Sequence, residues 1–145
     1  MKDETLDLPA FLPYQLSVAS NRVSAEIARL YADRFGLTIP EWRMMAILGR
    51  FPGLSANEVA ERAAMDKVQV SRAVARMISS GLLDRTLSPD DRRRSALQLS
   101  DNGLNIYRQI VPLAKSYERR IAERLEPDER KALSSALIKL AKAAE

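Results

Sequence analysis

The segment from Ser55 to Leu99 constrains the fold more than any other part of the chain. Ser55 and Glu58 have the spacing of a capping box, which predicts the start of a short helix. Asp66 predicts the N-cap of a second helix, which Gly81 ends, and the link between the two helices is only a few residues long. Two short helices joined by a tight link are typical of a helix-turn-helix.

A β-hairpin is predicted directly after the two helices. Residues 82–87 alternate well enough for a strand, and Leu97 and Leu99 lie two apart on a returning strand. The first strand is expected to carry, on one side, Leu83, Arg85 and Leu87. The turn at residues 88–94 contains a proline, two aspartates and three consecutive arginines. Together these elements predict a winged helix-turn-helix in residues 37–99, which is a device for reading duplex DNA.

Positive charge is concentrated in the same segment. Between Lys67 and Arg94 there are seven basic and three acidic residues, so this stretch accounts for the whole net charge of +4. A local basic excess is typical of a phosphate-binding surface, whereas a charge run alone usually marks a solvated face. The chain has no Cys and no His, which excludes disulfides and thiolate metal sites and removes the commonest general base. We therefore expect neither an enzyme nor a bound cofactor or metal.

Long helical patterns flank the winged segment. Residues 11–36 and 100–145 carry apolar residues at three- and four-residue spacing, and residues 1–10 are expected to form a frayed arm. These apolar stripes are larger than one small reading domain can cover, which predicts a homodimer with two recognition helices roughly 34–36 Å apart on the DNA. The expected architecture is one domain over residues 1–145, mainly α with a small β-wing, in which the long N- and C-terminal helices dimerise.

Two further features bear on where such a protein works. No apolar run approaches the length that spans a bilayer, and the acidic N-terminus does not fit a signal peptide. We expect a cytoplasmic protein that makes no membrane contact.

The outer face of the second helix carries the candidate base-reading residues. Arg72 can donate two hydrogen bonds to guanine, and Gln69 can pair in the same way with adenine, each for about 1–3 kcal/mol of discrimination. Ser71 suits either a base or a phosphate. Val68 also faces outward on the helical wheel, where it either meets a thymine methyl group or is a stray exposed apolar residue. The inward face is expected to hold Val70, Ala73, Val74, Met77 and Ile78.

Other basic residues are candidates for positioning contacts. Lys67 and Arg76 lie at the edges of the outer face, where they suit phosphates. At the hairpin tip, Arg92, Arg93 and Arg94 suit a narrow A·T-rich minor groove, whose negative potential attracts an inserted arginine. One of the three is expected to pair with Asp91 and brace the turn while another reaches the groove. The alternative is that these charges only keep the hairpin tip in solvent and do not contact DNA.

Several motifs combine into a recognisable pattern. They lie in residues 65–72, 81–85, 91–93, 97–103 and 37–43. This pattern resembles the MarR family of transcription regulators over nearly the whole chain. The resemblance implies a homodimer with interlocked terminal helices that binds double-stranded DNA at a pseudo-palindromic operator. It also implies a repressor that is released by a small aromatic or phenolic effector.

The resemblance assigns roles to single residues. Arg93 corresponds to the minor-groove arginine and Asp91 to its brace. The oxidation-sensing branch of the family depends on a cysteine, which this chain lacks. The family's effector site lies between the dimer helices and the reading domain, where this chain offers Ser20, Val23, Ser24, Ile27, Trp42, Arg43 and Met45.

Within this zone, Arg43 is the candidate partner of a carboxylate effector, because a partly buried guanidinium needs an anionic partner. The alternative for Arg43 is an internal salt bridge to Asp or Glu, and the alternative for Trp42 is a plain core residue. Two other functions also stay open: a winged-helix regulator without an effector, and an adaptor whose long helices dock a partner protein.

Overall fold

The computed structural model describes residues 4–87 and 95–144. These residues form one short 3-10 helix, six α-helices and a two-stranded antiparallel sheet, so the mainly helical fold with a small β-wing is confirmed. The elements are η1 (Leu8–Ala10), α1 (Leu12–Phe35), α2 (Ile39–Arg50), α3 (Ala56–Ala63), α4 (Lys67–Ser79), β1 (Leu83–Leu87), β2 (Ser95–Leu99), α5 (Asp101–Ala122) and α6 (Pro127–Ala143). The chain divides into two compact units, residues 1–108 and 109–145.

Local signals set the helix boundaries in the first unit. Gly36 follows α1 in the left-handed conformation with φ 67°, and Thr38 caps α2 by accepting a hydrogen bond from the Glu41 backbone N–H. The predicted capping box of Ser55 and Glu58 is present in full at the start of α3. The expected arm at residues 1–10 differs in one respect, because residues 8–10 form the 3-10 turn η1.

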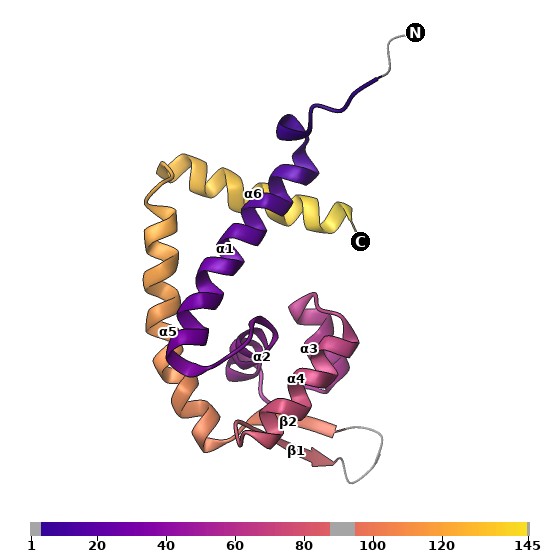
Figure 1. Ribbon diagram of the computed structural model, residues 1–145, viewed down its shortest axis with the longest axis vertical. Coiled ribbons are helices and arrows are strands. Elements are labelled where there is room, and N and C mark those ends of the chain that lie inside the picture. The colour runs from indigo at the N-terminus through magenta and orange to yellow at the C-terminus, as the bar shows by residue number, and fades with distance from the viewer. Residues whose placement is uncertain (1–3, 88–94, 145) are drawn as a thin grey trace. The chain divides into compact units, whose positions relative to one another are not determined.

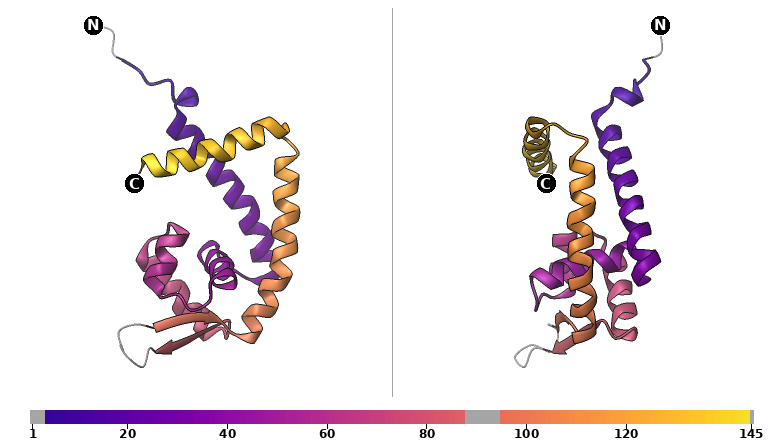
Figure 2. Two further views of the ribbon diagram at one scale, coloured as in Figure 1. Left: turned by 180° about the vertical axis from the view of Figure 1, so that it is seen from behind. Right: turned by 90° about the vertical axis from the view of Figure 1, so that its left-hand side faces the viewer.

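The core of the first unit lies between α2, α3, α4 and the hairpin. These elements contact one another and lie together in all three views (Figures 1 and 2). The most completely buried side chains are Tyr31, Met44, Met45, Leu48, Met77, Leu83, Leu97, Val59, Val70 and Val74. Their burial supplies the apolar contact that holds short helices such as α3 in place, since helices of this length are marginal in isolation.

The β-hairpin is joined by backbone hydrogen bonds to the link between α2 and α3. In the sheet, Leu83 pairs with Leu99 and Leu87 with Ser95. Leu97 also forms a bridge to Leu54, its N–H donating to the Leu54 carbonyl at 2.8 Å, and its own carbonyl accepts from Gly53 at the same distance. Of the three residues expected on one side of β1, only Leu83 is buried; Arg85 and Leu87 are exposed. The far end of β1 therefore lies away from the core.

The junction between the hairpin and α5 leaves no room for a side chain at Gly103. Ser100 Oγ donates to the Gly81 carbonyl at 2.7 Å and accepts from the Gly103 N–H at 3.0 Å. A Cβ atom at position 103 would overlap the backbone carbonyl oxygen of Leu82. Glycine is therefore required here by a close backbone approach.

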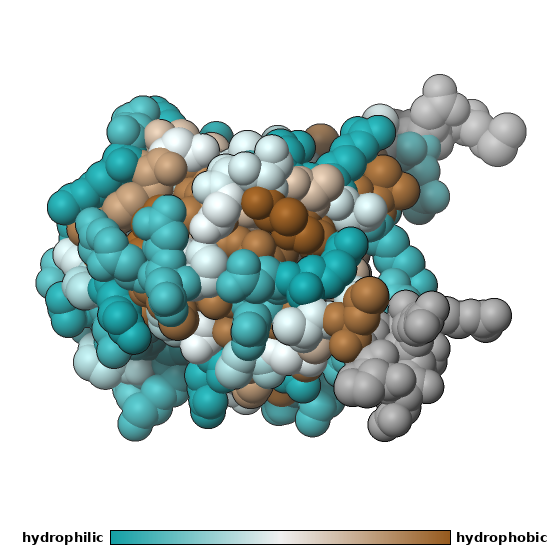
Figure 3. Space-filling view, turned by 90° about the horizontal axis from the view of Figure 1, so that it is seen from below, coloured by the Kyte–Doolittle hydropathy of each residue, from teal (hydrophilic) through white to brown (hydrophobic). Residues whose placement is uncertain are grey.

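The second unit contains the C-terminal part of α5 and all of α6. Pro127 lies in the first turn of α6, and Glu126 forms a capping box with Glu129. Every described residue of α6 is exposed, including the apolar side chains Leu133, Leu137, Ile138 and Leu140. Figure 3 shows one face of the molecule, on which hydrophilic residues interrupt the hydrophobic ones. No helix in the described ranges has the length and apolar composition needed to cross a bilayer.

Candidate DNA-binding surface

Helix α4 separates a buried row of side chains from an exposed one. The buried row contains Val70, Ala73, Val74 and Met77, which pack into the core. The six predicted contact residues on this helix are all exposed: Lys67, Val68, Gln69, Ser71, Arg72 and Arg76. Val68 is 54% exposed, so an apolar side chain stands in solvent beside the polar ones. Ile78 was expected on the inward face but is 39% exposed, because it lies in the last turn of the helix beyond the closest packing.

The link before α4 is as tight as the sequence predicts. Ala64 ends α3 in the left-handed conformation with φ 52°, and the Met65 N–H donates to the Ala60 carbonyl at 3.0 Å. Asp66 then caps α4, its carboxylate accepting from the Val68 N–H at 2.8 Å. The first turn of α4, with its outward side chains, is thus fixed by a backbone hydrogen bond in the link and by the Asp66 side-chain cap.

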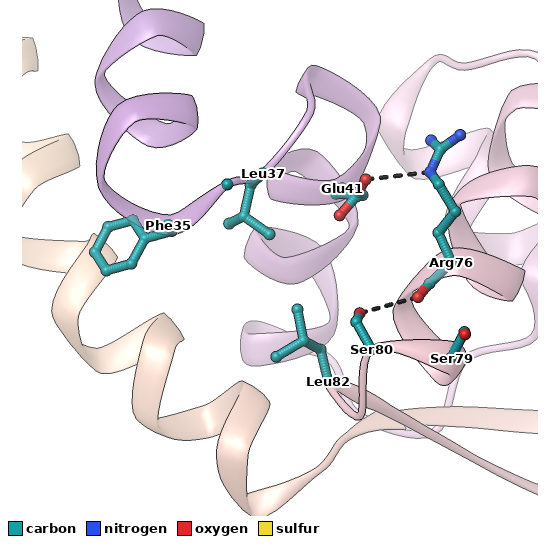
Figure 4. A pocket seen from close by; sticks show the side chains of 8 residues that line it. Phe35, Leu37, Glu41, Arg76, Ser79, Ser80 and Leu82 are labelled. Atoms are coloured by element: carbon teal, nitrogen blue, oxygen red, sulfur yellow. Dashed lines mark hydrogen bonds and ion pairs between the residues drawn. The ribbon is translucent and has the colours of Figure 1, made fainter.

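The position of Arg76 is set by an acid that the sequence reading missed. Arg76 Nε donates to Glu41 Oε1 at 3.2 Å, which joins α4 to α2 (Figure 4). Glu41 is only 7% exposed, and the same oxygen accepts from Thr38 Oγ1 at 3.0 Å. The Arg76 side chain is half exposed, and its terminal nitrogens make no ion pair among the described residues. Arg76 therefore combines a structural contact with an exposed guanidinium edge.

The predicted wing contacts Asp91, Arg92, Arg93 and Arg94 lie outside the described residues. Of the basic side chains on the strands, Arg85 is described and is exposed.

The expected effector residues are only partly brought together. Arg43 Nη2 donates to Ser24 Oγ at 3.5 Å, which joins α2 to α1. The alternative of an internal salt bridge for Arg43 is not seen in residues 4–87 and 95–144. Both Arg43 and Ser24 are half-buried, whereas Ser20 is exposed and Met45 is fully buried. Val23 is exposed and Ile27 half-buried on α1.

Tyr31 is a residue of this zone that the sequence reading counted only as part of an apolar stripe. Its ring lies 5.1 Å from that of Trp42, with the two planes tilted by 48°. The Tyr31 hydroxyl and the Trp42 Nε1–H are both buried, and neither has a hydrogen-bond partner among the described residues. Burial raises the pKa of the Tyr31 hydroxyl. Two unpaired donors therefore lie on the same pair of helices that carries Ser24 and Arg43.

Comparison with known proteins relates the chain to one family. A family model described as "MarR family" matches residues 35–94, which begin at the end of α1 and include α2, α3, α4 and β1. Over these residues the chain is similar to the MarR family. The curated relatives and solved structures that the chain matches are transcriptional regulators and not enzymes.

Three relatives illustrate the similarity. The transcriptional regulator YfiV of Bacillus subtilis is 25% identical over 112 residues, which are 77% of this chain and 70% of YfiV. The transcriptional repressor IacR of Pseudomonas putida is 30% identical over 107 residues, which are 73% of this chain and 64% of IacR. The structure of PcaV from Streptomyces coelicolor, in complex with its natural ligand, is 26% identical with a TM-score of 0.80 and covers 98% of this chain and 99% of PcaV.

Proposed function

We propose that this protein is a transcriptional regulator of the MarR family, a homodimeric repressor that binds a pseudo-palindromic operator and is released by a small aromatic carboxylate or phenol. The observation that carries the DNA-binding part is the exposed row on α4, which stands over a buried row and presents Arg72, Gln69 and Val68 together. In the major groove, Arg72 reads guanine, Gln69 reads adenine and Val68 meets a thymine methyl group. Such a protein works in the cytoplasm, where its operator is.

The remaining contacts supply affinity and register. Lys67 and the exposed edge of Arg76 contact phosphates, and Ser71 serves a base or a phosphate. In the hairpin tip, Arg93 enters the minor groove with Asp91 as its brace, and Arg92 and Arg94 flank it, as the family resemblance implies. Residues 37–99 form the reading part of this proposed single domain, and residues 11–36 and 100–145 form its dimerisation helices.

A DNA-selection experiment followed by a binding assay tests this proposal. Fragments bound by the purified protein are sequenced, and the recovered operator is titrated with wild type and with the double variant Arg72→Ala, Arg93→Ala. We expect the variant to lose at least a hundredfold in affinity, since two base- or groove-directed arginines are removed from each protomer. The matched control, Arg29→Ala with Arg34→Ala, removes the same charge from exposed positions on α1 and should bind normally. Unchanged binding by the α4 and wing variant rejects the assigned surface.

Unpartnered apolar residues support the homodimer. Leu133, Leu137 and Ile138 of α6 are 47%, 44% and 56% exposed, and Leu12 at the start of α1 is 50% exposed. An apolar surface of this kind is normally covered in an oligomer. Sedimentation at micromolar concentration should give a dimer. A monomer that still binds a palindromic operator tightly would contradict this part of the proposal.

Unpaired donors on α1 and α2 support an effector site. Arg43 supplies a positive charge next to Ser24, and the Tyr31 hydroxyl and Trp42 Nε1–H have no partner in the described part of the chain. A carboxylate or phenolate accepts hydrogen bonds from such groups. The ligand-bound relative PcaV supports a ligand in this chain as well.

The effector proposal has a direct optical test, because Trp42 is the only tryptophan in the chain. Titration with benzoate and with phenol should change Trp42 fluorescence in a saturable way, and Arg43→Gln should weaken benzoate more than phenol. Added benzoate or phenol should also release the operator. DNA binding that persists at saturating ligand favours an effector-independent regulator, and no affinity for duplex at low salt favours a protein-interaction adaptor.

A further inference from the structure

A cavity of about 410 Å³ lies in the first unit; of the exposed row of α4 only Arg76 lines it, and none of the effector residues named above does. Its volume falls in the range of small-molecule sites, roughly 300–1,000 Å³. Three segments surround it: the end of α1 with its link to α2, the first turn of α2, and the last turn of α4 with the start of β1 (Figure 4). The lining residues are Phe35, Gly36, Leu37, Glu41, Arg76, Ser79, Ser80 and Leu82.

Glu41 supplies the carboxylate that lines this cavity, beside its ion-pair partner Arg76. Both of its side-chain hydrogen bonds, from Thr38 Oγ1 and Arg76 Nε, end on Oε1. In the described part of the chain, Oε2 has no hydrogen-bond partner, although Glu41 as a whole is only 7% exposed. Figure 4 shows one carboxylate oxygen turned to Arg76 and the other turned towards the space above Leu82. A carboxylate oxygen without a protein partner is favoured by a donor that reaches it.

Arg76 pairs with this carboxylate through Oε1 only, which leaves Oε2 open to the cavity. Figure 4 shows its terminal guanidinium nitrogens on the side remote from Phe35, Leu37 and Leu82. The opposite wall is apolar, since Phe35, Leu37 and Leu82 provide it, and the Ser79 side chain lies at the exposed edge. The cavity thus combines an apolar body with one negatively charged oxygen.

We propose that this cavity binds a small organic ammonium ion, whose apolar part packs against Phe35, Leu37 and Leu82 and whose N–H donates to Glu41 Oε2. An ammonium suits the site better than an anion, because the nearest unsatisfied group is a carboxylate oxygen. It also suits the site better than a neutral molecule, because burial of the carboxylate strengthens its interaction with a positive charge. The site is separate from the aromatic-acid site proposed between α1 and α2, so either can exist without the other.

The test compares two probes of nearly equal size and shape. Benzylammonium and the neutral benzyl alcohol are titrated into the full-length protein, and binding is followed by calorimetry and by the backbone amide shifts of Leu37, Ser79 and Ser80. We expect saturable binding of benzylammonium with one site per chain, and at least tenfold weaker binding of benzyl alcohol. Absence of saturable benzylammonium binding, or equal affinity for both probes, overturns the proposal.

Variants localise the binding. Glu41→Gln removes the negative charge and should lower the affinity for benzylammonium at least tenfold. Because this variant also breaks the ion pair to Arg76, a second variant, Ser79→Phe, fills the exposed edge of the cavity and leaves both charged residues in place; it should abolish binding too. Arg29→Gln, at an exposed position on α1 that does not line the cavity, is the matched control and should bind benzylammonium as wild type does. Wild-type affinity in a folded Glu41→Gln or Ser79→Phe protein refutes the assignment.

Discussion

The ion pair between Arg76 and Glu41 predicts that replacing Arg76 lowers the free energy of unfolding more than replacing Glu41 does. Replacing Arg76 with Met leaves a carboxylate that is 7% exposed and keeps only the hydrogen bond from Thr38. Breaking a fully buried pair in this way costs about 3–5 kcal/mol. Because the Arg76 side chain is 51% exposed, solvent screens part of this interaction. We therefore expect Arg76→Met to lower the free energy of unfolding by about 1–2 kcal/mol.

The reverse substitution should cost less. In Glu41→Gln the half-exposed Arg76 guanidinium can be rehydrated, and the glutamine oxygen can still accept its N–H, so the expected loss is about 0.5 kcal/mol. The double variant has no unpaired charge, so its expected loss is about 1 kcal/mol. Against single losses of about 1.5 and 0.5 kcal/mol, this gives a coupling energy of about 1 kcal/mol.

Urea unfolding of the four proteins at neutral pH and one fixed protomer concentration measures this cycle, since oligomerisation makes apparent stability depend on concentration. Arg72→Met is the matched control: Arg72 is exposed on the same helix and makes no ion pair among the described residues, so it should change stability by less than about 0.5 kcal/mol. Equal losses for Arg76→Met and Glu41→Gln, or a coupling energy near zero, would refute the reasoning.

Three further predictions concern single residues. Val68→Ala should change the free energy of unfolding by less than about 0.5 kcal/mol but weaken operator binding by about 1 kcal/mol, measured by fluorescence anisotropy. Unchanged operator binding would mean that Val68 is an exposed apolar residue without a contact to DNA. Gly103→Ala should lower the midpoint of urea unfolding by the equivalent of about 1–3 kcal/mol, because the new Cβ overlaps the Leu82 carbonyl; a wild-type midpoint contradicts this. Burial raises the pKa of Tyr31 above its unfolded value, so the stability that Tyr31 contributes is present below pH 10 and is lost as the pH rises further. Tyr31→Phe should therefore lose less stability than wild type between pH 9 and pH 11, and identical losses would count against a raised pKa.

Much of the fold could be predicted because its signals are local. Ser55 with Glu58, Asp66, and Gly36 each act through hydrogen bonds or backbone angles within a few residues, and all three boundaries appear where the sequence placed them. The inward row of α4 was predicted by helical spacing alone. Ile78 was placed wrongly because spacing gives the direction of a side chain but not whether another element reaches it at the end of a helix.

The parts of the candidate site that could not be predicted depend on distant contacts. Glu41 and Arg76 are 35 residues apart, and a helical wheel gave Arg76 only an outward direction. Thr38 and Glu41 have the spacing of a helix cap, which accounts for an acid at position 41 by contacts within α2 alone. The sequence therefore gives no reason to expect a second partner on α4. Tyr31 fitted an apolar stripe on α1, and only its contact with Trp42 shows two buried donors side by side.

The bridge between Leu54 and Leu97 limits how the hairpin can adapt to DNA. Two backbone hydrogen bonds tie the middle of β2 to the segment that leads into α3, so the hairpin base cannot swing without displacing the helix pair. A rigid reader of this kind has a fixed span between the two grooves it touches. Target sites whose groove spacing differs must therefore deform to fit, and flexible base steps between the contacted positions become part of the selection.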